Sequence, residues 1–390
     1  MTAMPQQDHD PLRVVIAGGG VAALEAAVAL RSRAPARIAI TLVAPHDDFS
    51  YRPLTVAEPF GLAPRRHHRL SELCAGLDAG LVLDAVAAVD ADGHVVRTAG
   101  HRDIPYDVLL VAVGARAYPA FEHGIAFDRE TAPEDFDDVL ADLDDGLVPH
   151  VAIVVPDGVT WTLPAYELAL LLQARAERRH PDAVCVSVIT HEPRPLAVFG
   201  QRAAAEVGAL LDASRVVVHP GVHADVVTPT ALRVAGAWMS TDRIVALPIL
   251  EGPRIAGLPH DEHGFVPVDE QCRVVGVPDV HAAGDGTTVA IKQGGLAAQQ
   301  ADAAAAAIAA RAAGRPAPAP EAMVLRGLLP TPDGPRFLRA ELADPDRTSA
   351  VSREPLWWPP TKVASRWLAP HLARIERSEG ETRPTAGQSA

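Results

Sequence analysis

The stretch that decides the fold is RVVIAGGGVAALEAAVA, residues 13–29, in which an apolar run leads through glycines into an alanine-rich segment. Gly18, Gly20 and Ala23 are spaced as G-x-G-x-x-A. In this pattern the first glycine permits a tight turn, and the second lets the backbone approach a pyrophosphate. The small third residue lets the following helix pack on the strand. We therefore predict a dinucleotide site between a strand and a helix.

The composition is that of a globular chain long enough for two or more domains. Its 390 residues are 48% hydrophobic and 22% charged, and no stretch reaches the roughly 18 apolar residues of a membrane span. The polar opening MTAMPQQDHD lacks the features of a secretory signal, so we expect a cytoplasmic protein. A formal net charge of -14 argues against a nucleic-acid partner.

The three cysteines predict neither a disulfide framework nor a metal site. Cys74, Cys185 and Cys272 are far apart and form no C-x-x-C or Cys/His spacing. We expect reduced thiols, with Cys185 and Cys272 buried or inert.

A second apolar run, residues 37–43, ends at Ala44 and Pro45. Dinucleotide sites place an acidic residue here, where it binds the adenosine ribose. Its absence leaves three alternatives: backbone atoms bind the ribose, Asp47 binds it, or the ribose is held weakly.

Two later apolar runs also end in glycine. One lies in YDVLLVAVGARAYP, residues 106–119, and ends at Gly114; the other lies in VPDVHAAGDGTTVA, residues 277–290, and ends at Gly284 and Asp285. Together with the first unit, these stretches resemble the flavoproteins with two dinucleotide-binding domains. That superfamily includes disulfide reductases, type II NADH dehydrogenases and sulfide:quinone oxidoreductases.

The resemblance implies FAD as the cofactor. It implies that Asp285 binds the ribityl chain and that residues 292–296, at the start of a helix, face the isoalloxazine ring. A helix N-terminus there stabilises the anionic reduced flavin. The implied FAD-binding residues are Gly18, Gly20, Val21, Ala22, Ala23, Ala44, Pro45, Arg52, Pro53, Val86, Ala112, Val113, Gly114, Gly284, Asp285, Lys292, Gly294 and Gly295.

Strands and helices alternate again between the FAD motifs, which predicts an α/β fold with two Rossmann-like doubly wound domains. The predicted elements are strand 151–155, helix 164–178, strand 183–189, helix 202–212 and strand 215–218. Because the Gly284-Asp285 motif comes later, the second domain is inserted into the first. We predict an FAD domain of residues 12–115 and 262–314, a second domain of 116–261, and a C-terminal extension of 315–390 with a disordered tail from residue 378.

The second unit lacks the glycines of the first. Its turn, PDGVTWTLP at residues 156–164, has one glycine and a bulky Trp161, which obstruct the approach of a pyrophosphate. We therefore expect a poor site for NAD(P)H. Glu192 is either a partner for the nicotinamide ribose or, in the reading we favour, a solvated carboxylate.

A narrower resemblance, to sulfide:quinone oxidoreductases, explains this turn. That family has G-x-x-C-x-G-P-A-Y-E here, matched by Gly158 and by PAYE at 164–167, with Trp161 in place of the reactive cysteine. Its N-D-Y-F-x-F-x-P segment resembles HDDFSYRP at 46–53, and its K-x-G resembles Lys292 with Gly294. Sulfide oxidation through a cysteine pair is therefore not expected.

Three residues are candidates for catalysis. Lys292 is a cation near the flavin, and Trp161 replaces the cysteine of the relatives. Glu167 opens a helix, where the helix dipole alone would also favour an acid.

The C-terminal extension is rich in tryptophan. In WWPPTKVASRW, residues 357–367, we predict a helix from about Thr361 with Val363, Trp367 and Leu368 on one side. Such aromatic and basic residues suit peripheral contact of residues 357–372 with the inner face of a membrane, or packing against the chain itself or a second subunit in a homodimer.

These observations predict an FAD-dependent oxidoreductase without reactive cysteines, passing electrons from an unidentified small-molecule donor to a quinone or another acceptor. An NAD(P)H dehydrogenase with an atypical nicotinamide site is the alternative enzyme. An FAD-binding protein without turnover is the alternative of another class.

Overall fold

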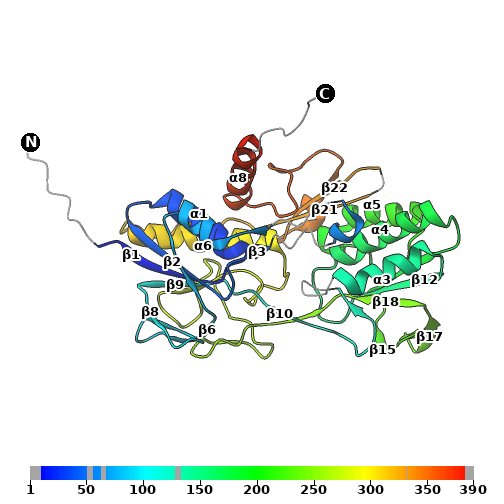
Figure 1. The fold of residues 1–390 in the computed structure, drawn as a ribbon, viewed down its shortest axis with the longest axis horizontal. Coiled ribbons are helices and arrows are strands. Elements are labelled where there is room, and N and C mark those ends of the chain that lie inside the picture. The colour runs from blue at the N-terminus through cyan, green and yellow to red at the C-terminus, as the bar shows by residue number, and fades with distance from the viewer. Residues whose placement is uncertain (1–9, 51–55, 63–66, 128–132, 332, 383–390) are drawn as a thin grey trace, which may run out of the picture.

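Two parallel sheets lie side by side in the computed structural model, and the end of the chain lies above the boundary between them (Figure 1). This is the predicted α/β class with two Rossmann-like domains. The structure describes residues 10–50, 56–62, 67–127, 133–331 and 333–382. Arg52 and Pro53, two of the predicted FAD-binding residues, lie outside the described residues.

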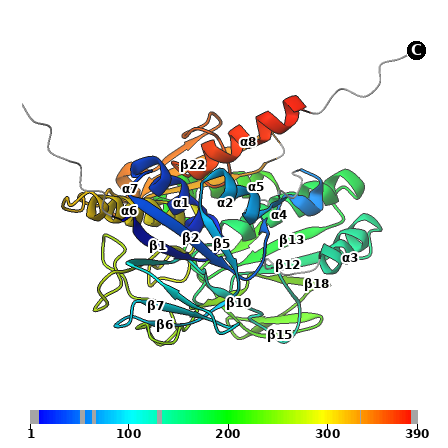
Figure 2. The same cartoon turned by 60° about the vertical axis from the view of Figure 1, so that its left-hand side comes forward.

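The first sheet has the strand order β20-β9-β1-β2-β5, with every neighbouring pair parallel. Helices α1 and α6 pack against each other on one face through small alanines, while the antiparallel β6-β7-β8 sheet covers the other (Figure 2). The elements are β1 (Leu12–Ala17), α1 (Val21–Arg33), β2 (Ile38–Ala44), β3 (Phe49–Ser50), η2 (Glu58–Phe60), β4 (His67–His68), α2 (Leu70–Gly76), β5 (Gly80–Leu83), β6 (Val86–Asp90), β7 (Val95–Thr98), β8 (Asp103–Pro105), β9 (Val108–Val111), β20 (Val280–Ala282) and α6 (Gly294–Ala312).

The second sheet has the strand order β11-β18-β12-β13-β14 and is also parallel. Helices α3, α4 and α5 share a core on one face, and β15-β16-β17 covers the other. Antiparallel β10 and β19 join the two domains. The elements are β10 (Arg116–Tyr118), β11 (Ile125–Ala126), α3 (Pro133–Asp144), β12 (His150–Val154), α4 (Leu163–Arg179), β13 (Cys185–Ile189), η3 (Ala197–Phe199), α5 (Gln201–Ala213), β14 (Val217–His219), β15 (Ala224–Thr228), β16 (Ala231–Val234), β17 (Ala237–Ser240), β18 (Arg243–Ala246) and β19 (Ile249–Glu251).

The C-terminal extension is a folded part of the molecule. Its antiparallel sheet, β21 (Val324–Leu329), β22 (Arg336–Glu341) and β23 (Ala350–Ser352), contacts α4 and α6, and α7 (Pro345–Thr348) lies between its last two strands. Helix α8 (Leu368–Thr382) packs on α1. The disordered tail was predicted from residue 378, so its first part is wrong, because α8 continues to Thr382. Residues 383–390 lie outside the described part.

The predicted helix from Thr361 is also wrong. Residues 361–367 are irregular, and α8 begins only at Leu368, with Pro370 in its first turn, where proline is tolerated. No helix in the described ranges is long and apolar enough to span a membrane.

Two of the three clustered tryptophans pack inside the molecule. Trp357 lies edge-on to Phe337 with ring centroids 5.0 Å apart, and Trp367 packs on the first core beneath Arg33. Trp358 remains 85% exposed. Packing against the chain itself, one of the predicted alternatives, therefore accounts for most of this segment.

Candidate functional site

A cavity of about 880 Å³ lies between the two domains, beyond the carboxyl ends of the strands of the first sheet. Ligands of doubly wound sheets bind at this edge. The predicted FAD-binding residues that line it are Gly18, Gly20, Val21, Ala22, Ala44, Pro45, Val86, Ala112, Val113, Gly114, Gly284, Asp285, Lys292 and Gly294. Ala23 and Gly295 are packed in the structure and do not line it.

The glycine turn before α1 fits a pyrophosphate. A Cβ on Gly20 would meet no atom within 4 Å, so the backbone here is open to the cavity. Gly20 is the N-cap of α1, which has no side-chain cap and no acid in its first turn, so its N–H groups are available to an anion. Position 18 requires glycine for a different reason: its φ is +132°, and a Cβ would lie 2.2 Å from the Ala112 carbonyl oxygen.

Asp47, one of the alternatives for binding the ribose, does not line the cavity. Its carboxylate accepts from the Ser71 backbone N–H at 2.7 Å and from the Arg69 guanidinium at 2.6 Å, which lowers its pKa. It therefore anchors the start of α2. Its neighbours His46 and Asp48, together with Ala44 and Pro45, line the cavity instead.

Lys292 is held at the cavity wall. Its ammonium group lies 3.7 Å from the centre of the Phe265 ring and donates to the Thr287 carbonyl oxygen. Burial lowers the pKa of Lys292 to about 8, although Asp285 and Asp261 oppose this shift. The N-terminus of α6 beside it is capped by the Gln293 side chain, which accepts from Leu296 N at 2.8 Å.

The loop after β12 closes one side of the cavity. The Thr160 hydroxyl donates to the Ala290 carbonyl oxygen at 2.6 Å, which ties this loop to the first domain. Trp161 is half-buried against Phe199, with ring centroids 6.0 Å apart, and also lines the cavity. The indole is therefore part of the wall.

Glu192 is not the solvated carboxylate that we predicted. It is buried, and its Oε2 accepts from the Tyr166 hydroxyl at 2.7 Å. Burial raises the pKa of Glu192, and burial beside Glu192 also raises the pKa of Tyr166. Because the carboxylate faces inward to α4 and does not line the cavity, it is badly placed for a nicotinamide ribose as well.

Glu167 has a partner that the sequence did not predict. It is fully buried, forms an ion pair with Lys362, and lines the cavity together with that lysine. The Lys362 ammonium group also donates to the Leu328 carbonyl oxygen at 2.9 Å, while Glu167 Oε2 has no hydrogen-bond partner among the described residues. Burial lowers the pKa of Lys362 to about 7.

One signal in the sequence did point to Lys362. Lysine occurs only twice in the chain, at 292 and 362, and both side chains line the cavity. Elsewhere the chain uses arginine, whose charge is permanent, whereas a buried lysine readily loses its proton. Arg326 is a second missed residue: it also lines the cavity, and its Nε is buried with no hydrogen-bond partner among the residues that the structure describes.

The cysteines lie away from the cavity lining. Cys74 and Cys272 are buried, and burial raises their pKa values to about 11 and about 12. Cys185 was predicted to be buried or inert, but it is exposed, because it is the first residue of β13 and points away from the core. Among the described residues there is no group of three or more His, Cys, Asp or Glu that could hold a metal ion.

Comparison with known proteins identifies one matching family model. The model described as pyridine nucleotide-disulphide oxidoreductase matches residues 12–307. An NADH dehydrogenase-like protein found in two strains of Mycobacterium tuberculosis is 29% identical over an alignment of 216 residues that covers 51% of this chain and 53% of that protein. The chain thus spans about half the length of the curated relatives it matches.

Solved structures share the fold over most of the chain. The sulfide:quinone oxidoreductase of the hyperthermophilic bacterium Aquifex aeolicus has a TM-score of 0.79 at 20% identity, covering 87% of this chain and 86% of that one. A ferredoxin reductase of Rhodopseudomonas palustris has a TM-score of 0.63 at 20% identity, covering 84% and 82%. The TM-scores show that these proteins share the fold of this chain, and at this level of identity the likeness extends to the fold alone.

Proposed function

Since this chain belongs to the pyridine nucleotide-disulphide oxidoreductase family, we propose that it is an FAD-dependent oxidoreductase that passes electrons from a small-molecule donor to a quinone. FAD, when bound, supplies the redox centre that accepts electrons from one partner and releases them to the other. Gly20, the open N-terminus of α1 and Asp285 would hold it, because they line the cavity at the edge of the first sheet.

The observation that supports this proposal most directly is that the structure shows no hydrogen bond to Glu167 Oε2 from any residue that it describes. A quinone takes up protons at its carbonyl oxygens as it is reduced, so its site needs a group that can hold and transfer a proton. Glu167 Oε2 is buried at the cavity and has no hydrogen-bond partner in the part of the chain that the structure describes, and it lies beside the Lys362 ammonium group with its lowered pKa. Trp161, Leu163 and Val363 supply apolar wall around the pair.

The donor is not sulfide reacting through protein thiolates. Trp161 stands where a reactive cysteine would be, and the three cysteines lie outside the cavity lining. A persulfide on the protein requires an accessible thiolate, and two of the three thiols are buried with raised pKa values.

An NAD(P)H dehydrogenase is the second candidate function. The observation that favours it is the similarity to NADH dehydrogenase-like proteins. Two features weigh against it. The turn after β12 lacks the glycine set of a pyrophosphate site, and Glu192 faces Tyr166 instead of the cavity.

Membrane contact, a cytoplasmic location and a homodimer remain predictions. For residues 357–372, the feature that supports contact with a membrane surface is the exposed ring of Trp358. A quinone dissolved in a bilayer would make such contact useful.

The oxidative half-reaction tests the proposal without knowledge of the donor. The FAD-loaded protein is reduced by light with EDTA and mixed anaerobically with decylubiquinone or menadione in a stopped-flow instrument. We expect saturable reoxidation, slowed about 100-fold by Glu167→Gln, as for loss of a proton-transfer group. Glu177→Gln, on the same helix but outside the cavity lining, is the control.

Reoxidation that is unsaturable and unaffected by Glu167→Gln would reject the quinone site. Failure of the wild type to be reoxidised by any added acceptor would favour the FAD-binding protein without turnover.

A further inference from the structure

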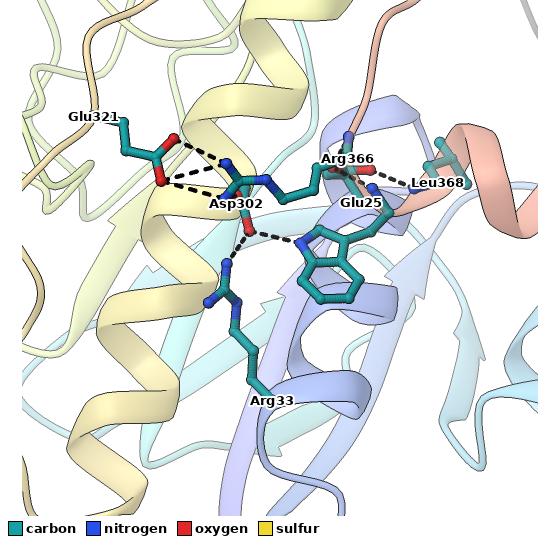
Figure 3. A network of polar contacts seen from close by, with 7 residues as sticks. Glu25, Arg33, Asp302, Glu321, Arg366 and Leu368 are labelled. Carbon is teal, nitrogen blue, oxygen red and sulfur yellow. Dashed lines mark hydrogen bonds and ion pairs between the residues drawn. The ribbon is translucent and has the colours of Figure 1, made fainter. Parts of the chain in front are cut away.

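Glu25 is a fully buried carboxylate in α1 that lies outside the cavity lining. Its Oε1 accepts from the backbone N–H groups of Arg366 at 2.9 Å and Trp367 at 3.0 Å, and its Oε2 accepts from that of Leu368 at 2.6 Å (Figure 3). Leu368 is the first residue of α8, where backbone N–H groups have no partner within the helix. A side chain near the start of the protein thus caps a helix near its end.

Charged groups from α1, α6 and the linker after α6 surround this cap (Figure 3). Asp302 of α6 accepts from the Trp367 indole at 2.8 Å, from the Arg366 guanidinium at 2.9 Å and from Arg33 of α1 at 2.6 Å. Glu321 accepts from Arg366 at 2.9 Å. Residues 366–368 are therefore fixed from several sides, and among the side chains that the structure describes Glu25 is the buried one that accepts from their main-chain N–H groups.

The segment held in this way continues directly into the cavity. Lys362 and Val363 line the cavity, and only Ala364 and Ser365 separate them from Arg366. The Thr361 hydroxyl donates to the Val363 carbonyl oxygen at 2.7 Å, and the Ser365 hydroxyl accepts from Ala369 N at 2.7 Å. Because this connection is short, we expect a shift at 366–368 to be transmitted to Lys362.

We propose that Glu25 is a positioning residue for the acceptor end of the cavity: by fastening residues 366–368 to α1, it sets the Lys362 ammonium group against Glu167. The consequence for turnover rests on the proposed quinone site. Helix α1 would then serve both ends of the cavity, because its N-terminus meets the FAD side and Glu25 holds the lysine on the other side.

The two lysines of the chain give a direct readout. In FAD-loaded protein labelled with [6-13C]lysine, each lysine contributes one Cε signal. Glu25→Gln keeps the size of the side chain, but when its amide oxygen accepts from Arg366 and Trp367, its NH2 group faces the Leu368 N–H and cannot accept from it. We expect Glu25→Gln to move the Lys362 signal and shift its titration upward toward that of a solvated lysine. The Lys292 signal, an internal control, should stay in place.

Asp344→Asn is the matched control variant. Asp344 caps α7 in the same C-terminal region by accepting from Arg347 N, away from the cavity lining. It should leave both lysine signals unchanged. If Glu25→Gln does not fold, Glu25→Asp retains the charge with a shorter reach and should displace the Lys362 signal alone. Unchanged Lys362 signals in a folded Glu25 variant would overturn the proposal.

A double-mutant cycle distinguishes positioning of Lys362 by Glu25 from a general contribution of Glu25 to the stability of the fold. In the quinone assay, Glu25→Gln should raise the half-saturating quinone concentration about tenfold, the effect of losing one charge-assisted hydrogen bond. The same change should have no further effect in a Lys362→Met background. Equal effects in both backgrounds would contradict action through Lys362. If quinone fails to reoxidise the wild type, the proposed function is lost, yet the lysine signals still decide the role of Glu25.

Discussion

Glu167 and Lys362 form an ion pair at the cavity wall although 195 positions separate them in the sequence. Glu167 belongs to α4 of the second domain, and Lys362 belongs to the irregular segment before α8. Because Glu167 is fully buried, loss of its partner would strand a charge at a cost of about 3–5 kcal/mol. The pair therefore links the end of the chain to both the stability and the chemistry of the cavity.

The first prediction concerns the pH dependence of reoxidation by quinone. Burial lowers the pKa of Lys362 to about 7, so its charge is present below that pH and lost above it. We expect the reoxidation rate to fall as the pH rises through about 7, and the decline to disappear in Lys362→Met. Stopped-flow measurements between about pH 5.5 and 8.5 test this. A decline that persists in Lys362→Met would assign the titration to another group.

The second prediction concerns Glu25 and folding stability. Burial raises the pKa of Glu25 from 4.5 to about 7, so the folded protein binds this proton more tightly than the unfolded chain. The resulting stabilisation is fully present below pH 4.5 and is lost as the pH rises through about 7. Relative to Glu25→Gln, the free energy of unfolding of the wild type should fall by up to about 3 kcal/mol across this range.

Urea unfolding of both proteins at several pH values measures this difference. The exposed Glu72→Gln, in α2, serves as the control. A difference between wild type and Glu25→Gln that stays constant with pH would show that the pKa of Glu25 is the same in both states.

The third prediction separates two glycines of one turn. Gly20→Val should leave the fold intact but weaken FAD retention, because the new side chain enters open space at the cavity. Gly18→Ala should destabilise the apoprotein by about 3 kcal/mol or more, because its Cβ would collide with the Ala112 carbonyl oxygen at a positive φ. Absorbance at 450 nm after dialysis and thermal unfolding distinguish the two. Full FAD occupancy in Gly20→Val would place the pyrophosphate elsewhere.

The fourth prediction concerns the electron donor. NADH and NADPH should reduce the wild type slowly and without saturation, and Trp161→Ala should accelerate the reaction by opening the wall beside Phe199. Trp161→Cys should gain partial reactivity with sulfide at most, since it restores one thiol of a pair. Trp238→Ala, at an exposed position on β17, is the control. Tight, saturable NADH reduction that is insensitive to Trp161 would favour the dehydrogenase.

The fifth prediction concerns membrane contact. Deleting the C-terminal extension would remove Lys362 and the β21-β22-β23 sheet, so a point change at the exposed ring is the cleaner test. If residues 357–372 meet a membrane surface, Trp358→Ser should weaken binding to anionic liposomes in co-sedimentation. Trp238→Ser should have no effect. Equal sedimentation of wild type and Trp358→Ser would show that this ring does not anchor the protein.

The residues that line the cavity at the edge of the first sheet could be predicted from the sequence because their positions depend on local structure. Gly18 and Gly20 act through the backbone of a single turn, and the Gly284-Asp285 motif follows directly on its strand. The parallel sheets likewise follow from short apolar runs that alternate with helices. Patterns of this kind need no knowledge of the rest of the chain.

The part of the cavity wall that contains Glu167 and Lys362 was decided by the tertiary structure. Glu192 had the spacing of a ribose ligand, yet the packing of α4 on β13 buries it against Tyr166. The tryptophans at 357 and 367 had the composition of a membrane anchor, but β22 and α1 supply surfaces that bury them. Lys362 meets Glu167 from a segment whose far end is bonded to Glu25 of α1. Burial and pairing are properties of surfaces that distant segments form together, and no local run of residues contains both partners.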